Sequence, residues 1–375
     1  MADKQAPLLL HAFSTFTMGG PQRRFLQIAN AFGPRYRHAI VAMDGNTKTV
    51  SGLNDDVMFD IVPMPAQKSG GLSLGNLRRM AAVIRDQKPD LLVSYNWGAI
   101  EWALVNRLLR LASQIHFEDG FGPEEAGGRQ ISRRVWTRRL AIGGRCELVV
   151  PSRTLATIAH DVWRIPDERC HFVPNGIELE RFADSTPLPM PFGDEHTVIG
   201  TIGMLRAEKN IGRLLRAFAQ LDDPAVRLTI VGEGSEGKAL RRQAEQLGLG
   251  DRIAFLGHTD YPERAHACFN IFALSSDTEQ MPYSVIEAMA AGLPVVATDV
   301  GDVRKMLAPS VAAECVVAKG DEAAFVQRLQ WLTSDPEACA RIGAANQAHV
   351  QASYGIDRML ETYDRLFQAR MRERR

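Results

Sequence analysis

Residues 271–299 of the chain read IFALSSDTEQMPYSVIEAMAAGLPVVATD. The short apolar runs IFALSS and PVVAT are both typical of buried strands. Between them lies SVIEAMAA, a predicted helix that Gly292 and Pro294 should end, because glycine suits the C′ position and proline cannot continue a helix. Pro282 is expected at the first helical position, where its fixed φ suits the helix. Strand, loop, helix and strand in this order form one unit of an open α/β sheet.

Two carboxylates stand out in this stretch. Glu279 lies in the loop beyond the carboxyl end of the first strand, and Glu287 lies eight positions later in the helix. Ligands of open α/β sheets bind at this edge, and a helix N-terminus there offers N–H groups to an anion. A carboxylate can also accept two hydrogen bonds from a vicinal diol. The alternative is a capped helix with one surface and one structural glutamate.

Together with the following AMAAGLPVVATDVG, this pair of glutamates resembles the donor-site signature of the family 4 glycosyltransferases, which have the GT-B fold. The resemblance implies that Glu279 binds sugar hydroxyls and Glu287 the ribose hydroxyls of a nucleotide. It also implies a donor site lined by the residues between them: Gln280, Met281, Pro282, Tyr283 and Ser284. Gln280 is a departure, because many relatives have glycine there, the residue that best tolerates an unusual backbone conformation.

The 375 residues suffice for two ordinary domains, and the apolar and charged contents of 45% and 23% are those of a soluble globular protein. The zero formal net charge argues against a nucleic-acid partner. The charge is unevenly spread, since residues 1–186 carry 23 Lys and Arg against 19 Asp and Glu (+4), whereas residues 187–375 carry 21 against 25 (−4).

Five scattered cysteines form no C-x-x-C pair, which predicts neither a zinc site nor a disulfide framework. The first residues, MADKQAPLLLHAF, have too short an apolar core for a signal peptide. No apolar run is long enough to span a membrane. We therefore expect a cytoplasmic protein.

The first half alternates strands and helices. Predicted strands at 7–15, 37–43, 57–62, 90–95, at the start of 113–125 and at 146–152 enclose predicted helices, including 72–86 and 97–110, and this alternation indicates a doubly wound parallel sheet.

The first strand leads through Gly19 and Gly20 into a helix, an arrangement in which the backbone can approach a phosphate, although such a glycine pair can also be a plain turn. In family 4 enzymes a glycine-rich loop here faces the donor diphosphate, and GGPQRR resembles that loop.

His116, Glu118 and Asp119 follow the carboxyl end of another predicted strand, in SQIHFEDGFGPEE. One interpretation is a polar loop with its own turn hydrogen bonds. The resemblance favours an acceptor site instead, with Asp119 contacting the acceptor hydroxyl and His116 binding sugar or phosphate.

An arginine-rich segment, 129–139, follows in the first half. Its cations Arg129, Arg133, Arg134 and Arg138 alternate with Ile131, Val135 and Trp136 in a predicted helix. A cationic helix with an aromatic residue can lie on an anionic membrane surface and bring a lipid-borne acceptor to the enzyme. A solvated arginine face with its apolar residues in the core is an equal alternative.

The second half begins after a proline-rich linker, STPLPMPFGDE (185–195). A strand, VIGTIG, precedes Arg206 and Lys209, which match the family's diphosphate clamp at GxLxxxKN-like spacing. A leaving nucleoside diphosphate gains negative charge, so fixed cations stabilise the transition state more than the ground state. Cations at a helix start are unfavourable unless an anion is bound there.

The resemblance covers almost the whole chain and implies two Rossmann-like domains facing a cleft. We expect an N-terminal acceptor domain, 1–186, with residues 353–375 packing back on it as a helix, and a donor domain, 187–352. The implied reaction moves a sugar from a nucleotide diphosphate sugar, UDP- or GDP-linked, to a lipid, lipid-linked or polysaccharide hydroxyl, with retention and without a metal or other cofactor. The alternatives are an inverting GT-B enzyme, a sugar-nucleotide epimerase and a non-catalytic two-domain binding protein.

Overall fold

A computed structural model describes residues 6–64, 73–121, 123–125, 130–183, 185–193 and 195–372. The chain forms two compact units, Met1–Pro174 with Asp357–Arg375, and Asn175–Ile356. These limits differ slightly from the expected domain boundaries at 186 and 352. Residues after Pro174 join the second unit because Ile177 N–H bonds Tyr354 O at 3.0 Å and Leu188 N–H bonds Arg264 O at 3.2 Å.

The first unit contains a parallel sheet of seven strands among the described residues, in the order β3-β2-β1-β4-β5-β6-β7. The strands are β1 Leu8–Phe13, β2 Arg37–Ala42, β3 Met58–Ile61, β4 Leu91–Tyr95, β5 Ser113–Phe117, β6 Cys146–Val150 and β7 Cys170–Phe172. The strand order reverses between β1 and β4, which is the switch point of a doubly wound sheet. The predicted parallel sheet is therefore confirmed.

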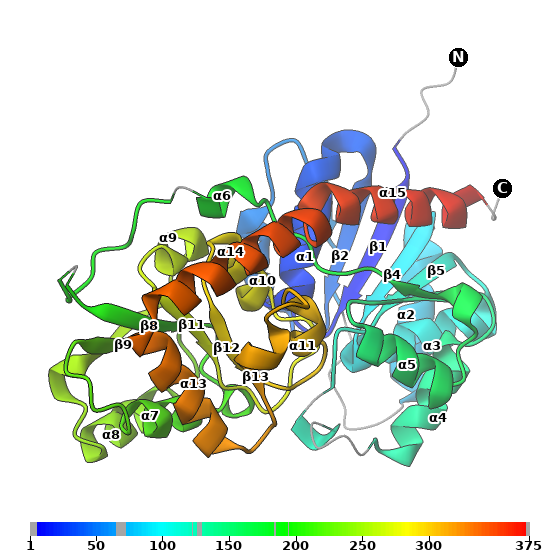
Figure 1. The fold of residues 1–375 in the computed structure, drawn as a ribbon. Helices are drawn as coiled ribbons and strands as arrows, with labels where there is room; N and C mark the ends of the chain where they lie inside the picture. The colour runs from blue at the N-terminus through cyan, green and yellow to red at the C-terminus, as the bar shows by residue number, and fades with distance from the viewer. Residues whose placement is uncertain are drawn as a thin grey trace. The chain divides into compact units, whose positions relative to one another are not determined.

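Six helices of the described residues accompany this sheet (Figure 1). They are α1 Gly20–Phe32, α2 Leu74–Gln87, α3 Ile100–Leu109, α4 Ser132–Ile142, α5 Arg153–Asp161 and α15 Ile356–Arg372. Short 3-10 turns lie at Gly33–Arg35, Lys48–Gly52, Trp97–Ala99, Pro123–Glu125 and Asp167–Arg169. The C-terminal helix α15 packs its Phe367 ring 6.5 Å from Phe32 at the end of α1 and its Tyr363 ring 5.6 Å from Phe117, so the last helix belongs to the first unit.

A row of polar side chains runs through the interior of this unit. His11 of β1 bonds His38 of β2 through Nε2 and Nδ1 at 3.0 Å, and Tyr95 Oη of β4 through its own Nδ1 at 3.0 Å. Burial lowers the pKa of His11 far below its ordinary value, and burial lowers the pKa of His38 to about 4. Both imidazoles are therefore neutral near pH 7.

The second unit contains a parallel sheet of six strands among the described residues, in the order β10-β9-β8-β11-β12-β13. The strands are β8 Thr197–Ile202, β9 Val226–Val231, β10 Ile253–Gly257, β11 Ile271–Leu274, β12 Val295–Thr298 and β13 Val316–Val317. The order again reverses once, between β8 and β11. This pair of strands therefore defines where a ligand of the second unit should bind.

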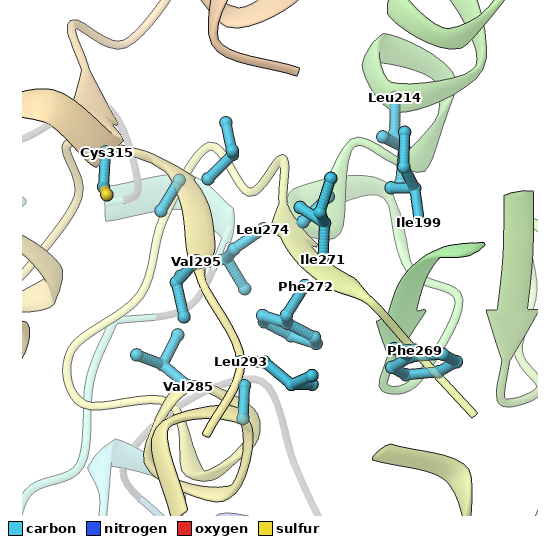
Figure 2. Packing of buried hydrophobic residues seen from close by; sticks show 14 of the residues in the cluster. Ile199, Leu214, Phe269, Ile271, Phe272, Leu274, Val285, Leu293, Val295 and Cys315 are labelled. Carbon is cyan, nitrogen blue, oxygen red and sulfur yellow. The ribbon is translucent and has the colours of Figure 1, made fainter. Parts of the chain in front are cut away.

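The described helices of this unit are α6 Glu180–Ala183, α7 Ile211–Phe218, α8 Gly237–Gln246, α9 Pro262–His266, α10 Tyr283–Ala290, α11 Val303–Met306, α12 Ala312–Cys315, α13 Glu322–Ser334 and α14 Pro336–Ser353, with 3-10 turns at Ala207–Lys209 and Gly250–Arg252. Figure 2 shows side chains of β8, β11 and β12 meeting those of α7 and α10 in the core. The Phe269 ring packs so closely on Gly200 of β8 that a Cβ there would lie 2.1 Å from it, which explains the glycine in a buried strand.

The stretch 271–299 forms the predicted elements β11, α10 and β12. Gly292 has φ +71° directly after the helix, as expected of a C′ glycine. Pro282 is the N-cap of α10, at φ −68° and ψ 127°, rather than its first helical residue. The long helix α14 was not predicted, because its buried face is built partly from the small residues Ala338 and Gly343, and the short helices α6, α9, α11 and α12 were not predicted either.

The described helices include none with the length and apolar character needed to cross a membrane.

Candidate functional site

The carboxyl ends of β8 and β11, at the switch point of the second sheet, lead into two loops that carry the predicted donor residues. Residues 203–210 follow β8, and residues 275–282 follow β11. A small hollow between the loops is lined by residues from both, including Gly203, Lys209 and Ser276. This is the edge at which ligands of open α/β sheets bind.

Lys209 and Glu279 meet in this place. The Lys209 ammonium donates to Glu279 Oε1 at 2.6 Å, and Ser276 Oγ donates to the same oxygen at 2.8 Å. Both side chains are partly exposed, so a ligand can reach them. The structure thus joins one predicted sugar-binding carboxylate to one predicted phosphate-binding cation, although the two residues are 70 positions apart.

Arg206 lies at the beginning of the same short turn, Ala207–Lys209. Its side chain is 51% exposed, and its closest carboxylate contact is 3.9 Å from Glu208 Oε1, a weak surface pairing. Arg206 is therefore an accessible cation on the same short turn as Lys209, and its part in a diphosphate clamp remains a prediction.

Glycines bring the loop after β8 close to the loop after β9. A Cβ on Gly232, whose φ is +131°, would lie 1.9 Å from Gly203 O, and a Cβ on Gly234 would lie 2.3 Å from Leu205 O. Leu205 N–H also bonds Glu233 O at 2.9 Å. Because α8 begins only at Gly237, these glycines let two loops touch and do not open the helix directly.

The residues after Glu279 adopt ordinary backbone conformations. Gln280 is not among the described non-glycine residues with positive φ. The demanding conformation belongs to Gly301, at φ +57°, where a Cβ would lie 2.3 Å from Glu279 O and 2.8 Å from Gln280 Cα. Gly301, which was not predicted as a site residue, therefore lets the following loop pack against the Glu279 backbone.

The other predicted donor residues differ in exposure. Met281 is buried, and its carbonyl accepts a bond of 2.9 Å from Asn175 Nδ2, whereas Tyr283 and Ser284 at the start of α10 are half-buried. Glu287 is buried inside α10, and its Oε2 lies 3.4 Å from Nε2 of His266 in α9. The assignment of Glu287 to ribose hydroxyls remains a prediction, and His266 is a partner that the sequence did not indicate.

In the first unit, Gly19 is the N-cap of α1 and Gly20 its first residue, directly beyond β1. A Cβ on Gly20 would have nothing within 4 Å, so the backbone there is open to an approaching ligand. This geometry agrees with a phosphate-friendly loop and equally with a plain turn, so the role of Gly19 and Gly20 remains a prediction.

Asp119 lies beyond the carboxyl end of β5 and is held from two sides. Arg24 of α1, almost fully buried, donates to Asp119 Oδ1 at 2.5 Å, and Asp119 N–H donates to Asn96 Oδ1 at 2.6 Å. Asp119 Oδ2 is buried without a hydrogen-bond partner among the described residues. Burial raises the pKa of the Asp119 carboxyl, and Arg24 partly offsets the rise. One oxygen is therefore fixed while the other can still accept a hydrogen bond.

Asn96 itself is strained, with φ +57° and ψ 178° at the end of β4. Such conformations cost free energy and concentrate at functional sites. Neither Arg24 nor Asn96 was predicted from the sequence.

His116 was expected to face sugar or phosphate, but its side chain is fully buried. Its Nδ1 lies 2.8 Å from Ser94 Oγ, and its Nε2 lies 3.5 Å from Glu118 Oε2. In this arrangement His116 reaches a ligand only through other groups, because the backbone of β5 points this side chain into the unit.

Arg138, expected on a membrane-facing or acceptor-facing surface, is also fully buried. Its guanidinium lies 3.4 Å from Glu118 Oε2 and 3.3 Å from Glu125 Oε2, and stacks 4.9 Å from the Trp163 ring. Burial alone would raise the pKa of Glu118, but Arg138 and His116 outweigh it and lower that pKa. Arg138 is therefore an internal counter-ion to two carboxylates, not a surface cation.

The remaining arginines of the segment divide between inside and outside. Arg134 is mostly buried and pairs with Glu124 and, at 3.3 Å, with Glu125. Arg133 is exposed, and Arg129 lies outside the described residues. The apolar residues Trp136 and Leu140, 66% and 51% exposed, accompany Arg133 on the outside of α4.

Within the described ranges no three His, Cys, Asp or Glu side chains are grouped so as to hold a metal ion. The cations Lys209 and Arg206 lie in the loop after β8, and their role in binding a diphosphate remains a prediction.

Known sequences and structures resemble both halves of this chain. Residues 190–349 match the family described as glycosyl transferases group 1. Residues 18–181 match the family described as glycosyltransferase family 4. An uncharacterized glycosyltransferase of Haemophilus influenzae is 29% identical over 92% of this chain and 95% of its own length.

A second relative is named "GDP-mannose-dependent monoacylated alpha-(1-6)-phosphatidylinositol monomannoside mannosyltransferase", from Corynebacterium glutamicum. It is 29% identical over 53% of this chain, which spans only 56% of that protein's length.

Solved structures share the fold over almost the whole chain. HepE of Anabaena, crystallised with UDP and glucose, matches with a TM-score of 0.79 at 20% identity, covering 96% of this chain and 99% of that one. WaaG, described as a glycosyltransferase of lipopolysaccharide biosynthesis, matches with a TM-score of 0.74 at 15% identity, covering 96% and 99%. The predicted pair of Rossmann-like domains is thereby confirmed as that of the GT-B glycosyltransferases.

Proposed function

Because the chain belongs to the group 1 and family 4 glycosyltransferases of the GT-B fold, we propose that it moves a sugar, with retention, from a nucleoside diphosphate sugar to a hydroxyl group of a lipid, lipid-linked or polysaccharide acceptor. The observation that carries the donor half of this proposal is the contact of Lys209 with Glu279 at the switch point of the second sheet. It combines a cation for phosphate with a carboxylate for sugar hydroxyls.

In the proposed reaction the bond between the sugar and the β-phosphate oxygen breaks, and the diphosphate leaves with increased negative charge. Lys209 and Arg206 stabilise that charge, and they do so more strongly in the transition state than in the ground state. Ser276 keeps its hydrogen bond to Glu279 while the Lys209 ammonium turns to the phosphate. Glu279 then accepts hydrogen bonds from the sugar hydroxyls and orients the ring.

On the acceptor side, Asp119 Oδ2 accepts a hydrogen bond from the attacking hydroxyl while Arg24 holds the other carboxylate oxygen. The proton of that hydroxyl passes to the departing phosphate oxygen, so attack and departure occur on the same face of the sugar. This route predicts retention of the anomeric configuration. Retention distinguishes the proposed enzyme from an inverting GT-B enzyme and from a sugar-nucleotide epimerase.

The UDP of the HepE structure and the GDP-mannose in the name of the Corynebacterium relative make uridine and guanosine diphosphates the first nucleotides to test. A thermal-shift screen would compare UDP, GDP and ADP, and their sugars, with the free nucleosides. A nucleotide at one hundred times its Kd should add about 2.7 kcal/mol to the free energy of unfolding. The product of the matching sugar donor should retain the anomeric configuration by NMR.

Two results would count against the donor proposal. A protein that is stabilised by none of these nucleotides would fit a binding protein for another ligand. A product with inverted configuration would remove the retaining mechanism and leave the inverting alternative.

We further propose that α4 docks reversibly on a membrane that carries the acceptor, at the cytoplasmic face. Trp136 and Leu140 supply exposed apolar surface, and Arg133 lies beside them on the same helix. An arginine near an anionic surface contributes about 1 kcal/mol, and Arg134 and Arg138 are engaged inside the protein. The docking should therefore depend more on apolar contact than on charge.

Co-sedimentation with anionic and neutral vesicles tests this docking. Trp136→Ser should reduce binding at least fivefold, whereas Leu74→Ser, which removes an equally exposed apolar side chain from α2, should leave it unchanged. Negligible binding of the wild-type protein to both vesicle types would favour a soluble acceptor.

A further inference from the structure

Two loops carry Lys209 and Glu279, and hydrogen bonds join these loops directly. Asp277 N–H donates to Glu208 O at 2.8 Å, and Ser275 Oγ donates to Lys209 O at 3.1 Å. These contacts fix the backbone on either side of the Lys209–Glu279 pair. The relative position of cation and carboxylate therefore depends on how firmly the loops are held together.

A buried arginine on the first turn of α7 bonds two residues of the loop after β11. Arg213 donates from one terminal nitrogen to Ser275 O at 2.9 Å and from the other to Asp277 Oδ1 at 2.8 Å. Its side chain is only 7% exposed. Both terminal nitrogens of the guanidinium therefore donate hydrogen bonds to the loop after β11.

Asn210 completes the arrangement from the loop after β8. Its Nδ2 donates to Asp277 Oδ2 at 2.9 Å, and its Oδ1 accepts from Arg213 N–H at 3.2 Å. Its φ of +42° is unusual for a residue other than glycine. Asp277 is consequently held through both oxygens, by Arg213 from the helix and by Asn210 from the turn that follows Lys209.

We propose that Arg213, acting through Asp277, is a positioning residue that sets Lys209 and Glu279 for the donor diphosphate and sugar. This inference rests on the proposed function. We assign Arg213 no contact with the donor itself, because its two terminal nitrogens bond Ser275 and Asp277 and its Nε lies 3.7 Å from Glu322 Oε1. Its planar fork gives two hydrogen bonds of fixed geometry, which the single ammonium of lysine cannot reproduce.

Arg213→Lys is the most informative substitution, since it keeps the charge and removes the fork. A misplacement of about 1 Å can lower a rate roughly 10²-fold. We expect kcat/KM for the donor to fall about 10- to 100-fold. The matched control is Arg216→Lys, on the same helix but exposed. It keeps a cation beside Glu322, whose Oε1 also lies 3.7 Å from Arg213 Nε, and it should stay within twofold of the wild-type protein.

Binding measurements separate positioning from folding. Calorimetry would compare UDP with UMP, and GDP with GMP, because only the diphosphates reach a second phosphate subsite beside Lys209. Arg213→Lys should lose about tenfold in affinity for the diphosphate that the wild-type protein binds, while its affinity for the monophosphate stays unchanged. Asp277→Asn should reproduce this selective loss, and the double variant should be no worse than either single one, since both act through one contact.

The outcomes distinguish this inference from the proposed function. If the wild-type protein binds none of UDP, GDP and ADP, both fail. If it binds one of them and Arg213→Lys and Asp277→Asn keep the wild-type ratio of diphosphate to monophosphate affinity, the inference alone is overturned. An equal loss for both ligands, or an unfolded Arg213→Lys with a normal Asp277→Asn, would also overturn it, because the role would then be structural.

Discussion

Replacing Arg138 by methionine should destabilise the first unit strongly. The substitution keeps most of the side-chain volume but removes the cation that lies between Glu118 and Glu125, whose side chains are fully buried. It also removes the stacking of the guanidinium on Trp97, Phe121 and Trp163. Two buried carboxylates would then share the site without their main counter-ion.

The magnitude follows from the burial of all three groups. Breaking a buried ion pair by removing one partner typically costs about 3–5 kcal/mol, because the other charge stays buried without compensation. For a unit of this size, 1 kcal/mol lowers the melting temperature by roughly 2–4 °C. We therefore expect the melting temperature of the first unit to fall by about 10 °C.

The pH dependence should change sign as well. In the wild-type protein the pKa of Glu118 is lowered in the folded state, so its contribution to stability is present above the unfolded value of 4.5 and is lost as pH falls through the folded pKa. Without Arg138, burial should raise that pKa. The variant should then regain stability as pH falls from 7 towards 4.5, because the folded state takes up the proton.

The assay is thermal unfolding of wild-type and Arg138→Met protein between pH 4.5 and 8, with Arg133→Met as the matched control from the exposed face of α4. The control should stay within about 0.5 kcal/mol of wild type, as is usual for surface changes. A melting temperature of Arg138→Met within 1 °C of the wild-type value at pH 7 would refute the internal role of Arg138 and restore it as a surface cation.

Three further predictions concern other parts of the chain. Asp119→Asn and Arg24→Met should each lower transfer to an acceptor at least tenfold while leaving the calorimetric affinity for the donor nucleotide unchanged; loss of donor affinity would instead place Asp119 at the donor. Burial lowers the pKa of His38 to about 4 against roughly 6.5 when unfolded, so the unfolded chain binds more protons between these values and stability falls as the pH falls there. Acid titration of urea unfolding should show that His38→Gln reduces this loss by roughly 3 kcal/mol, while the share of His11, whose pKa burial lowers further, remains; an unchanged profile would contradict it. Gly301→Ala should cost roughly 1–3 kcal/mol in urea unfolding, since its φ is +57° and its Cβ would meet Glu279 O; a neutral effect would show that the loop relaxes freely.

The elements of the second unit could be predicted because local signals agreed. In the stretch 271–299, apolar runs marked both strands, and Gly292 and Pro294 marked the end of the helix between them. Lys209 and Glu279 lie at one edge of the sheet for a related reason, since parallel strands deliver their loops to one edge. The helix α14 gave no such signal, because alanine and glycine on its buried face weaken the apolar periodicity that marks an amphipathic helix.

Side-chain orientation was harder to predict than position. Arg138 and Arg133 lie in one helix of alternating cations and apolar residues, yet one is buried and the other is exposed. The counter-ions that draw Arg138 inside, Glu118 and Glu125, lie in a preceding loop that periodicity does not connect to it. His116 was placed correctly at a strand end, but the sequence did not indicate that its ring faces the interior.

Partners distant in sequence explain the residues that were missed. Arg24 meets Asp119 across 95 positions, and Arg213 meets Asp277 across 64. A single sequence offers no signal for such pairs, since each member alone is an ordinary surface residue by composition. Only the folded chain identifies them as supports for the predicted site.

The measurement that tests the central claim most directly is release of nucleoside diphosphate from UDP- and GDP-linked sugars in the presence of acceptor, by wild-type protein and by Lys209→Ala. The wild-type protein should release diphosphate from at least one donor, and Lys209→Ala should lower kcat/KM by roughly 10²–10³, the usual effect of losing one preorganised charge-stabilising group. Full activity of Lys209→Ala, whose ammonium lies 2.6 Å from Glu279 Oε1, would contradict the assignment of this switch point as the donor site.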